Sequence, residues 1–143
     1  DDVVHLLDVN VLIALCDEGH EFHQRALAWF SRDPQRAWAT CPMTENGFVR
    51  IIGHRNYPGF SGGTAAARQI LEALCLLPGH QFWPDTVSLR DRLRFEHVPD
   101  SRQLTDYYLL GLSSARQGRL ATLDRGMDAS LVRGGSRAFF LIP

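Results

Sequence analysis

Short apolar runs alternate with helix-like segments along the whole chain, and this alternation limits the possible folds more than any other feature. Apolar residues at helical spacing predict the intervening helices. Strands separated by helices favour a mostly parallel sheet flanked by helices on both faces, which is an α/β fold. The predicted strands are 3–7, 37–41, 82–83, 120–123 and 138–142. The predicted helices start after Asn10 and cover 20–33, 44–53, 64–77, 85–95 and 104–117.

Two of these helices carry specific signals for their ends. Asp85 or Thr86 is suited to cap the start of the 85–95 helix. Gly118 follows the 104–117 helix and is suited to stop it. The segment from His54 to Gly63 holds one proline and three glycines, so we expect a loop there.

The length of the chain bounds its organisation and location. Its 143 residues, 45% of them hydrophobic, match one globular domain over 1–143. No apolar stretch approaches the roughly 18 to 20 residues that span a bilayer, and no positively charged leader precedes one. Cys16, Cys41 and Cys75 form an odd set without C-x-x-C spacing, which is typical of reduced thiols. We therefore expect a cytoplasmic protein that is not in a membrane.

The charge of the chain excludes one class of partner-binding mechanism. All 15 basic side chains are arginines, and the formal net charge is −1. That balance excludes a uniformly basic, tail-driven nucleic-acid binder, although an acidic site can coexist with a local arginine rim.

Two aspartates follow predicted strands directly. Asp8 comes after the first strand, and Asp124 comes after the 120–123 strand. In parallel sheets, ligands gather at the carboxyl ends of the strands. A single aspartate in this position is more often a helix cap or a turn residue, so neither one alone predicts a site.

Two further acids lie in the first turns of predicted helices, on their apolar faces. Glu45 shares a face with Phe48 and Ile52, and Asp106 shares one with Leu109 and Ser113. A capping-box role for Glu45 and a helix-dipole role for Asp106 are the ordinary alternatives.

If the four acids meet at one cleft, their repulsion demands a cation. Two unit charges about 4 Å apart repel by roughly 4 kcal/mol at an effective dielectric near 20. Oxygen-only ligands suit Mg²⁺ or Mn²⁺. No histidine or cysteine lies at zinc-like spacing beside these acids in the sequence, which disfavours zinc.

Four segments of the chain, in order, resemble the motifs of PIN-domain ribonucleases, and within them the VapC toxins of bacterial toxin–antitoxin pairs. The likeness extends over essentially the whole chain. The segments are Leu6–Ile13, Thr44–Glu45, Thr105–Leu109 and Leu120–Gly126.

The resemblance implies a PIN-like fold and a metal-dependent endoribonuclease that hydrolyses RNA phosphodiester bonds. Asp8, Asp106 and Asp124 would hold Mg²⁺ or Mn²⁺, and Glu45 would join them directly or through water. Asn10 and Thr122 match polar positions that support the acids. Hydrogen bonding within a turn or at a strand end is the alternative for these two residues.

The resemblance also implies partners. Arg125, which follows the last acid, and His54 and Arg55 in the long loop are candidates for RNA binding. Ordinary local ion pairing and a polar surface loop are the alternatives for these three. A VapB-like antitoxin and a homodimer are the protein partners that the likeness implies.

Two other functions compete with this one. A haloacid-dehalogenase-like phosphatase would need a second acid two residues after Asp8, where Asn10 stands, and a lysine that the chain lacks. A PIN-like module that binds RNA or protein without cutting is the second alternative. Gathering four mutually repelling carboxylates has no purpose in binding alone, which favours the nuclease.

Overall fold

The computed structural model describes residues 3–143, and within them five strands form one sheet. The sheet order is β3-β2-β1-β4-β5, and every neighbouring pair is parallel, which confirms the predicted α/β class. The strands are β1 (His5–Leu7), β2 (Trp38–Thr40), β3 (His80–Phe82), β4 (Arg119–Thr122) and β5 (Phe139–Leu141).

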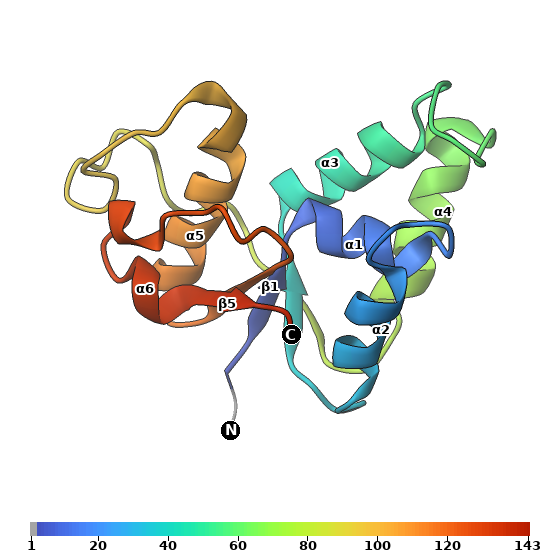
Figure 1. Ribbon diagram of the computed structural model, residues 1–143, viewed down its shortest axis with the longest axis horizontal. Coiled ribbons are helices and arrows are strands. Elements are labelled where there is room, and N and C mark those ends of the chain that lie inside the picture. Colours follow the sequence, from blue (N-terminus) through green and yellow to red (C-terminus); the bar gives the residue numbers. More distant parts are fainter. Residues whose placement is uncertain (1–2) are drawn as a thin grey trace.

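Helices cover both faces of this sheet, as expected (Figure 1). One face carries the first four helices and the other carries the last two. The helices are α1 (Val9–Cys16), α2 (His23–Ser31), α3 (Pro42–Ile52), α4 (Gly63–Cys75), α5 (Leu104–Ala115) and α6 (Gly135–Ala138). Two single 3₁₀ turns, at Ser101–Gln103 and Ala129–Leu131, flank the second group.

Side chains that alternate along the strands fill a separate core on each face of the sheet. Leu7 packs with Trp29 and Phe48 on the α1–α4 face, whereas its neighbour Leu6 packs with Leu110 on the α5–α6 face. Both leucines are fully buried. Burial of each such side chain contributes about 2 kcal/mol, so a strand of three residues is anchored from both sides.

The carboxyl ends of β1 and β4 lie side by side at the centre of the sheet. Leu7 pairs with Ala121, and the next amide, that of Asp8, donates to the Ala121 carbonyl at 3.2 Å. From β1 the chain crosses to β2 on one side, while β4 continues to β5 on the other. This divergence is where ligands bind in open parallel sheets.

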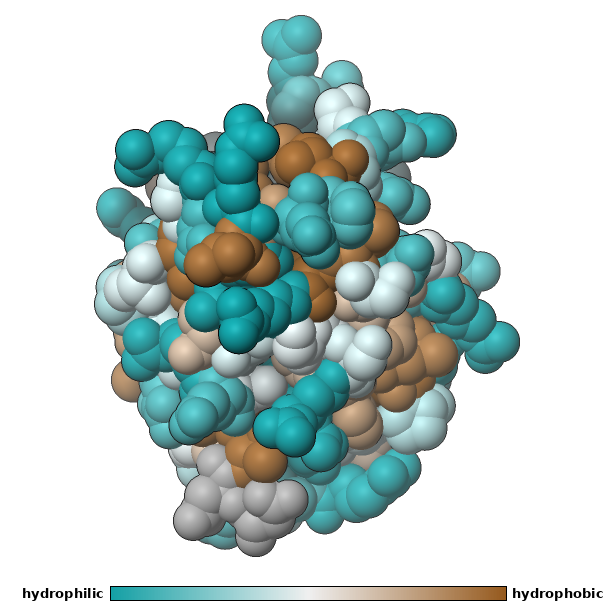
Figure 2. Space-filling view, turned by 90° about the vertical axis from the view of Figure 1, so that its left-hand side faces the viewer, coloured by the Kyte–Doolittle hydropathy of each residue, from teal (hydrophilic) through white to brown (hydrophobic). Residues whose placement is uncertain are grey.

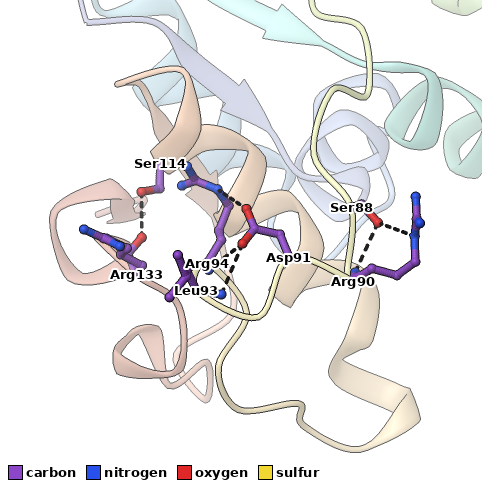
Figure 3. Close-up of polar contacts among 7 residues, drawn as sticks. All are labelled: Ser88, Arg90, Asp91, Leu93, Arg94, Ser114 and Arg133. Carbon is purple, nitrogen blue, oxygen red and sulfur yellow. Dashed lines mark hydrogen bonds and ion pairs between the residues drawn. The ribbon is translucent and has the colours of Figure 1, made fainter.

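The predicted helix over 85–95 is wrong, because the structure has turns there instead. The side chain of Asp91 accepts from the backbone amides of Leu93 and Arg94, and the side chain of Ser88 accepts from that of Arg90 (Figure 3). Such side-chain acceptors compete with helical hydrogen bonds. Leu93 is 76% exposed, so a helix here would gain little by burying an apolar stripe.

The segment that replaces this helix is fixed by one buried ring. Phe95 is 2% exposed and packs against Tyr107 and Tyr108 of α5. A Cβ at Gly111 would come within 2.2 Å of that ring, so α5 needs a glycine at this contact. Packing rather than periodicity therefore determines the path of this segment. The predicted caps, Asp85 and Thr86, have no helix to cap.

The end of α5 also differs from the prediction, because Gln117 and not Gly118 adopts the left-handed conformation, with φ of 57°. The Gly118 amide donates to the Ser113 carbonyl and the Gln117 amide to that of Ser114, a Schellman pair. Gly118 is required for another reason. A Cβ there would lie 2.7 Å from both the Trp83 ring and the Val4 carbonyl oxygen.

None of the helices within 3–143 is long and apolar enough to cross a bilayer. The side of the molecule formed by α5, α6 and the neighbouring loops is mostly hydrophilic, with separate apolar patches (Figure 2). Scattered apolar groups of this kind are ordinary on soluble surfaces and need no special explanation.

Candidate active site

Three of the four predicted acids line one cleft at the carboxyl ends of β1 and β4. Asp8 follows β1, Asp124 lies just beyond β4, and Asp106 comes from the first turn of α5. All three line the same pocket. Two adjacent strand ends and the start of one helix thus bring Asp8 together with Asp106 and Asp124, which follow it by 98 and 116 positions in the chain.

Asp8 is both a helix cap and a buried acid. Its Oδ1 accepts from the Asn10 amide at 2.9 Å, which caps α1, and its Oδ2 accepts from the Thr122 hydroxyl at 2.8 Å. The residue is only 5% exposed. Burial raises the pKa of its carboxyl, the two hydrogen bonds oppose that shift, and Asp124 adds to it. Asp8 therefore has the ordinary capping role and also lines the cleft, and its role as a metal ligand stays a prediction.

Thr122 forms hydrogen bonds with two of the acids. Its hydroxyl donates to Asp8 and accepts from the backbone amide of Asp124 at 3.1 Å. The Asp124 carboxylate is exposed and accepts from the Gly126 amide at 2.8 Å. Thr122 is fully buried, so this link is shielded from water.

Asp106 carries the clearest sign that the acids repel one another. Burial and, to a smaller extent, the charges of Asp8 and Asp124 together raise the pKa of its carboxyl from 3.8 to about 7. A carboxyl held near its protonation midpoint at neutral pH is typical of functional clusters. The face of α5 behind it is buried, with Leu109, Leu110 and Ser113 all fully enclosed, as its spacing predicted.

The structure does not bring Glu45 to this cleft, which corrects the expectation that all four acids meet. Its carboxylate Oε2 accepts from the Thr40 hydroxyl at 2.7 Å, at the end of β2. Its ligand atoms lie near those of Cys75 and His80. Glu45 is not the capping-box residue either, because the Thr44 hydroxyl accepts from the Cys41 amide at the start of α3.

Asn10 supports the site through its backbone rather than its side chain. Its amide caps onto Asp8, while its side-chain Oδ1 lies 3.1 Å from His20 Nε2. Both residues line the cleft. No sequence pattern predicts a partner for His20, since ten positions separate it from Asn10 and only the turn between α1 and α2 brings them together.

The cationic rim of the cleft differs in part from the prediction. Arg125 lines the cleft, as expected, but the exposed His54 and Arg55 do not. Arg50, in the last turn of α3, and Arg25, in α2, take their place. Arg25 is already engaged with the Ile142 carbonyl at 2.6 Å.

The long loop reaches the cleft through a different side chain. Tyr57 lines the cleft, and its hydroxyl donates to Asp17 at 2.5 Å, which ties the loop to the end of α1. This aromatic residue lies in the predicted His54–Gly63 loop, close to the candidates His54 and Arg55. Sequence alone marked the segment but not which of its members faces inward.

Comparisons with known proteins show which family this chain belongs to. A family model described as the PIN domain matches residues 5–129. The chain is 40% identical to Ribonuclease VapC44 of Mycobacterium tuberculosis over 136 residues, covering 92% of this chain and 94% of that one. The chain belongs to the PIN-domain family of VapC ribonucleases.

Two further VapC proteins of the same organism are similar. Identity is 43% to Ribonuclease VapC38, over 85% of this chain and 86% of that one. It is 41% to Ribonuclease VapC39, over 90% of this chain and 94% of that one.

A solved structure of VapBC2 from Rickettsia felis, bound to a DNA fragment from its promoter, shares this VapC fold. It superposes with a TM-score of 0.61 at 6% identity, over 98% of this chain and 99% of that one. Mycobacterium tuberculosis VapC20, described as a sarcin–ricin loop cleaving toxin, superposes with a TM-score of 0.58 at 12% identity, over 89% and 92%. At these identities the likeness supports the fold alone.

Proposed function

We propose that this VapC protein is a metal-dependent endoribonuclease whose metal ligands are Asp8, Asp106 and Asp124. The observation that carries the proposal is the convergence of these carboxyls on one cleft, where burial and mutual repulsion hold the pKa of Asp106 near 7. Keeping them together costs free energy unless a cation is present. The two-strand junction at which they meet is also the expected ligand position of this fold.

The donor set fits Mg²⁺ or Mn²⁺. All three side chains offer only carboxylate oxygens, the ligands that these hard cations prefer. Such an ion, when bound, would polarise a phosphodiester and lower the pKa of a water molecule bound to it, so that a hydroxide nucleophile is available near neutral pH. Asp8 is already oriented for this role by Thr122 and by the Asn10 amide.

The rest of the cleft suits a single RNA strand. Arg50 and Arg125 offer guanidinium groups to the backbone phosphates, and Tyr57 and Phe22 offer rings on which bases stack. Asp106, whose pKa is near 7 without a cation, has to lose its proton when it ligates one, so metal binding should release protons at neutral pH. Asp124, exposed at the mouth of the cleft, is the carboxylate most accessible to an incoming phosphate with its cation.

Membership of the VapC family supports the toxin role and its partners. We propose that the chain, one PIN domain over 1–143, acts in the cytoplasm, forms a homodimer and is inhibited by a VapB-like antitoxin. The net charge of −1 leaves the RNA target open, because specificity in single-strand recognition depends on local shape and stacking.

Incubation of the purified chain with total RNA tests the proposed activity. We expect discrete cuts with Mg²⁺ or Mn²⁺, none with a chelator, and ends that map to the same sites in both metals. The Asp124→Asn variant should bind RNA but leave it intact. Tight RNA binding by the wild-type chain without metal-dependent cuts would instead identify a binding module.

A further inference from the structure

Glu45, Cys75 and His80 form a second group of metal-ligating side chains away from the aspartate cleft. One ligand atom from each lies within 4.8 Å of the other two. Glu45 comes from the first turn of α3, Cys75 is the last residue of α4, and His80 is the first residue of β3. Three separate elements therefore contribute one ligand each.

Thr40 holds two of these three side chains in position. This fully buried last residue of β2 has its hydroxyl 2.7 Å from Glu45 Oε2 and 2.8 Å from His80 Nε2. The His80 ring also packs against that of Trp38, with centroids 4.7 Å apart. The hydroxyl donates its one proton to Glu45 and so accepts from His80 Nε2–H, and a zinc ion bound at Nε2 would replace that second hydrogen bond.

The chemistry of the group differs from that of the aspartate cleft. Thiolate, imidazole and carboxylate are the three ligand types that zinc accepts in proteins, whereas Mg²⁺ takes oxygen only. All three side chains are partly exposed, so an ion can enter from solvent. Tetrahedral bonds of about 2.0 to 2.3 Å require ligand atoms roughly 3.3 to 3.8 Å apart, so the group needs to contract by about 1 Å.

We propose that Glu45, Cys75 and His80 bind one zinc ion, with a water molecule in the fourth position. The site joins the start of α3 to the end of α4 and to β3, and so closes the 75–80 connection at the edge of the sheet. Ion binding stabilises the folded chain, because the unfolded chain does not hold these ligands together. The inference goes beyond the proposed nuclease, whose ion is held by other residues.

Cobalt titration of the full chain tests this site, because a thiolate bound to Co²⁺ gives a charge-transfer band that an oxygen-only site cannot give. We expect the band to saturate at one equivalent and to disappear when one equivalent of Zn²⁺ is added. Cys75→Ser should abolish the band, and His80→Ala and Glu45→Gln should each weaken cobalt affinity at least about tenfold.

Two matched variants assign the signal. Cys16→Ser removes another partly buried thiol and should leave the band unchanged. Asp106→Asn alters the aspartate cleft and should also leave it unchanged. Circular dichroism should show that each variant is folded, and Zn²⁺ should raise the melting temperature of the wild-type chain but not of Cys75→Ser.

Several outcomes overturn the proposal. These are a wild-type chain without a thiolate band, a band that survives in Cys75→Ser, and a band that disappears in Cys16→Ser. Zinc uptake that is lost in Asp106→Asn but kept in Cys75→Ser would assign the ion to the aspartates instead. None of these readouts involves RNA, so failure here leaves the nuclease assignment unaffected.

Discussion

The two acidic sites of this molecule are built in the same way and end in different chemistry. In each, the last residue of a strand is a fully buried threonine whose hydroxyl donates to a carboxylate: Thr122 to Asp8 and Thr40 to Glu45. Beside Asp8 stand two more aspartates, whereas beside Glu45 stand a thiol and an imidazole. Both sites thus have a buried threonine that holds a carboxylate, and the neighbouring side chains determine which ion can bind.

Position in the sheet explains the different neighbours. β1 and β4 are adjacent at the point where the chain connections diverge, so an open cleft forms above their ends. β2 and β3 lie to one side, where the first turn of α3 and the end of α4 pack over them. An acid that follows β2 therefore faces a helix end instead of the cleft.

The RNA cleavage rates of the Asp8→Asn and Glu45→Gln variants should show the largest difference between the two sites. We expect Asp8→Asn to lower the RNA cleavage rate at least about 100-fold, because a charge-stabilising group at the reacting centre is lost. Glu45→Gln should stay within about threefold of wild type, since its carboxylate lies outside the cleft. Single-turnover rates with one mapped RNA measure both. Equal losses in the two variants would break the comparison and return Glu45 to the nuclease site.

The two threonines form a matched pair for the next largest effect. Thr122→Val removes the hydroxyl that donates a hydrogen bond to Asp8 and accepts one from the Asp124 amide. We therefore expect the metal affinity measured in the cleavage assay to fall about 10- to 100-fold. Thr40→Val should leave that affinity unchanged. Magnesium dependence of the rate, measured for both variants, gives the values. A loss in Thr40→Val as large as in Thr122→Val would contradict the separation of the sites.

The pH dependence of stability sharpens the description of the aspartate cleft. The folded-state pKa of Asp106 is raised from 3.8 to about 7, so the folded chain binds more protons than the unfolded chain between these values. Without metal, the unfolding free energy should therefore decrease as pH rises through this window. At about pH 8, Asp106→Asn should be more stable than wild type by about 1 to 2 kcal/mol after screening of this partly exposed group.

Urea unfolding at several pH values measures this slope, and Mg²⁺ should remove most of it from the wild-type chain. Asp128→Asn is the control, because the Ser130 side chain lowers the pKa of Asp128, so this group stabilises the fold above its unfolded pKa. That variant should lose stability at high pH instead of gaining it. If the unfolding free energy of the metal-free wild-type chain instead rises with pH, the carboxyls do not repel one another and the proposal of a metal site fails.

The arginine rim gives the smallest expected effect. Arg50→Ala should weaken RNA binding a few-fold and reduce the salt dependence of affinity by about one phosphate contact, because Arg50 lines the cleft. Arg55→Ala should change binding less, since Arg55 lies outside the cleft. Fluorescence anisotropy across a salt series, in the Asp124→Asn background, measures both. The opposite ranking would indicate that RNA runs along the 54–63 loop.

Much of the aspartate site was predictable because its signals are local. Asp8 and Asp124 each follow a short apolar strand, and parallel strands end at one edge of a sheet, so their proximity follows from the fold class. Asp106 shares a helix face with residues that are indeed buried. Thr122 was named only because the chain resembles the PIN-domain ribonucleases, and not from its position in the strand.

Two other predictions, the 85–95 helix and Gly118 as the stop of α5, also rested on local sequence signals. They failed because contacts with distant residues determine the structure at both places. The 85–95 segment has a helical pattern, yet Ser88 and Asp91 form turns and only Phe95 is anchored in the core. Gly118 looked like a helix stop, yet its role is to admit the Trp83 ring. In both cases a tertiary contact outweighs a propensity of roughly a kilocalorie per residue.

By itself, the sequence determined the alternation of strands and helices, the parallel sheet and the aspartates at its strand ends. Each of these follows from periodicity and position within a few residues. Tertiary structure alone decided that Glu45 lies with Cys75 and His80, which are 30 and 35 positions away in the chain. Periodicity fixes which face of a helix is buried, but only the order of strands in the sheet fixes what that face meets.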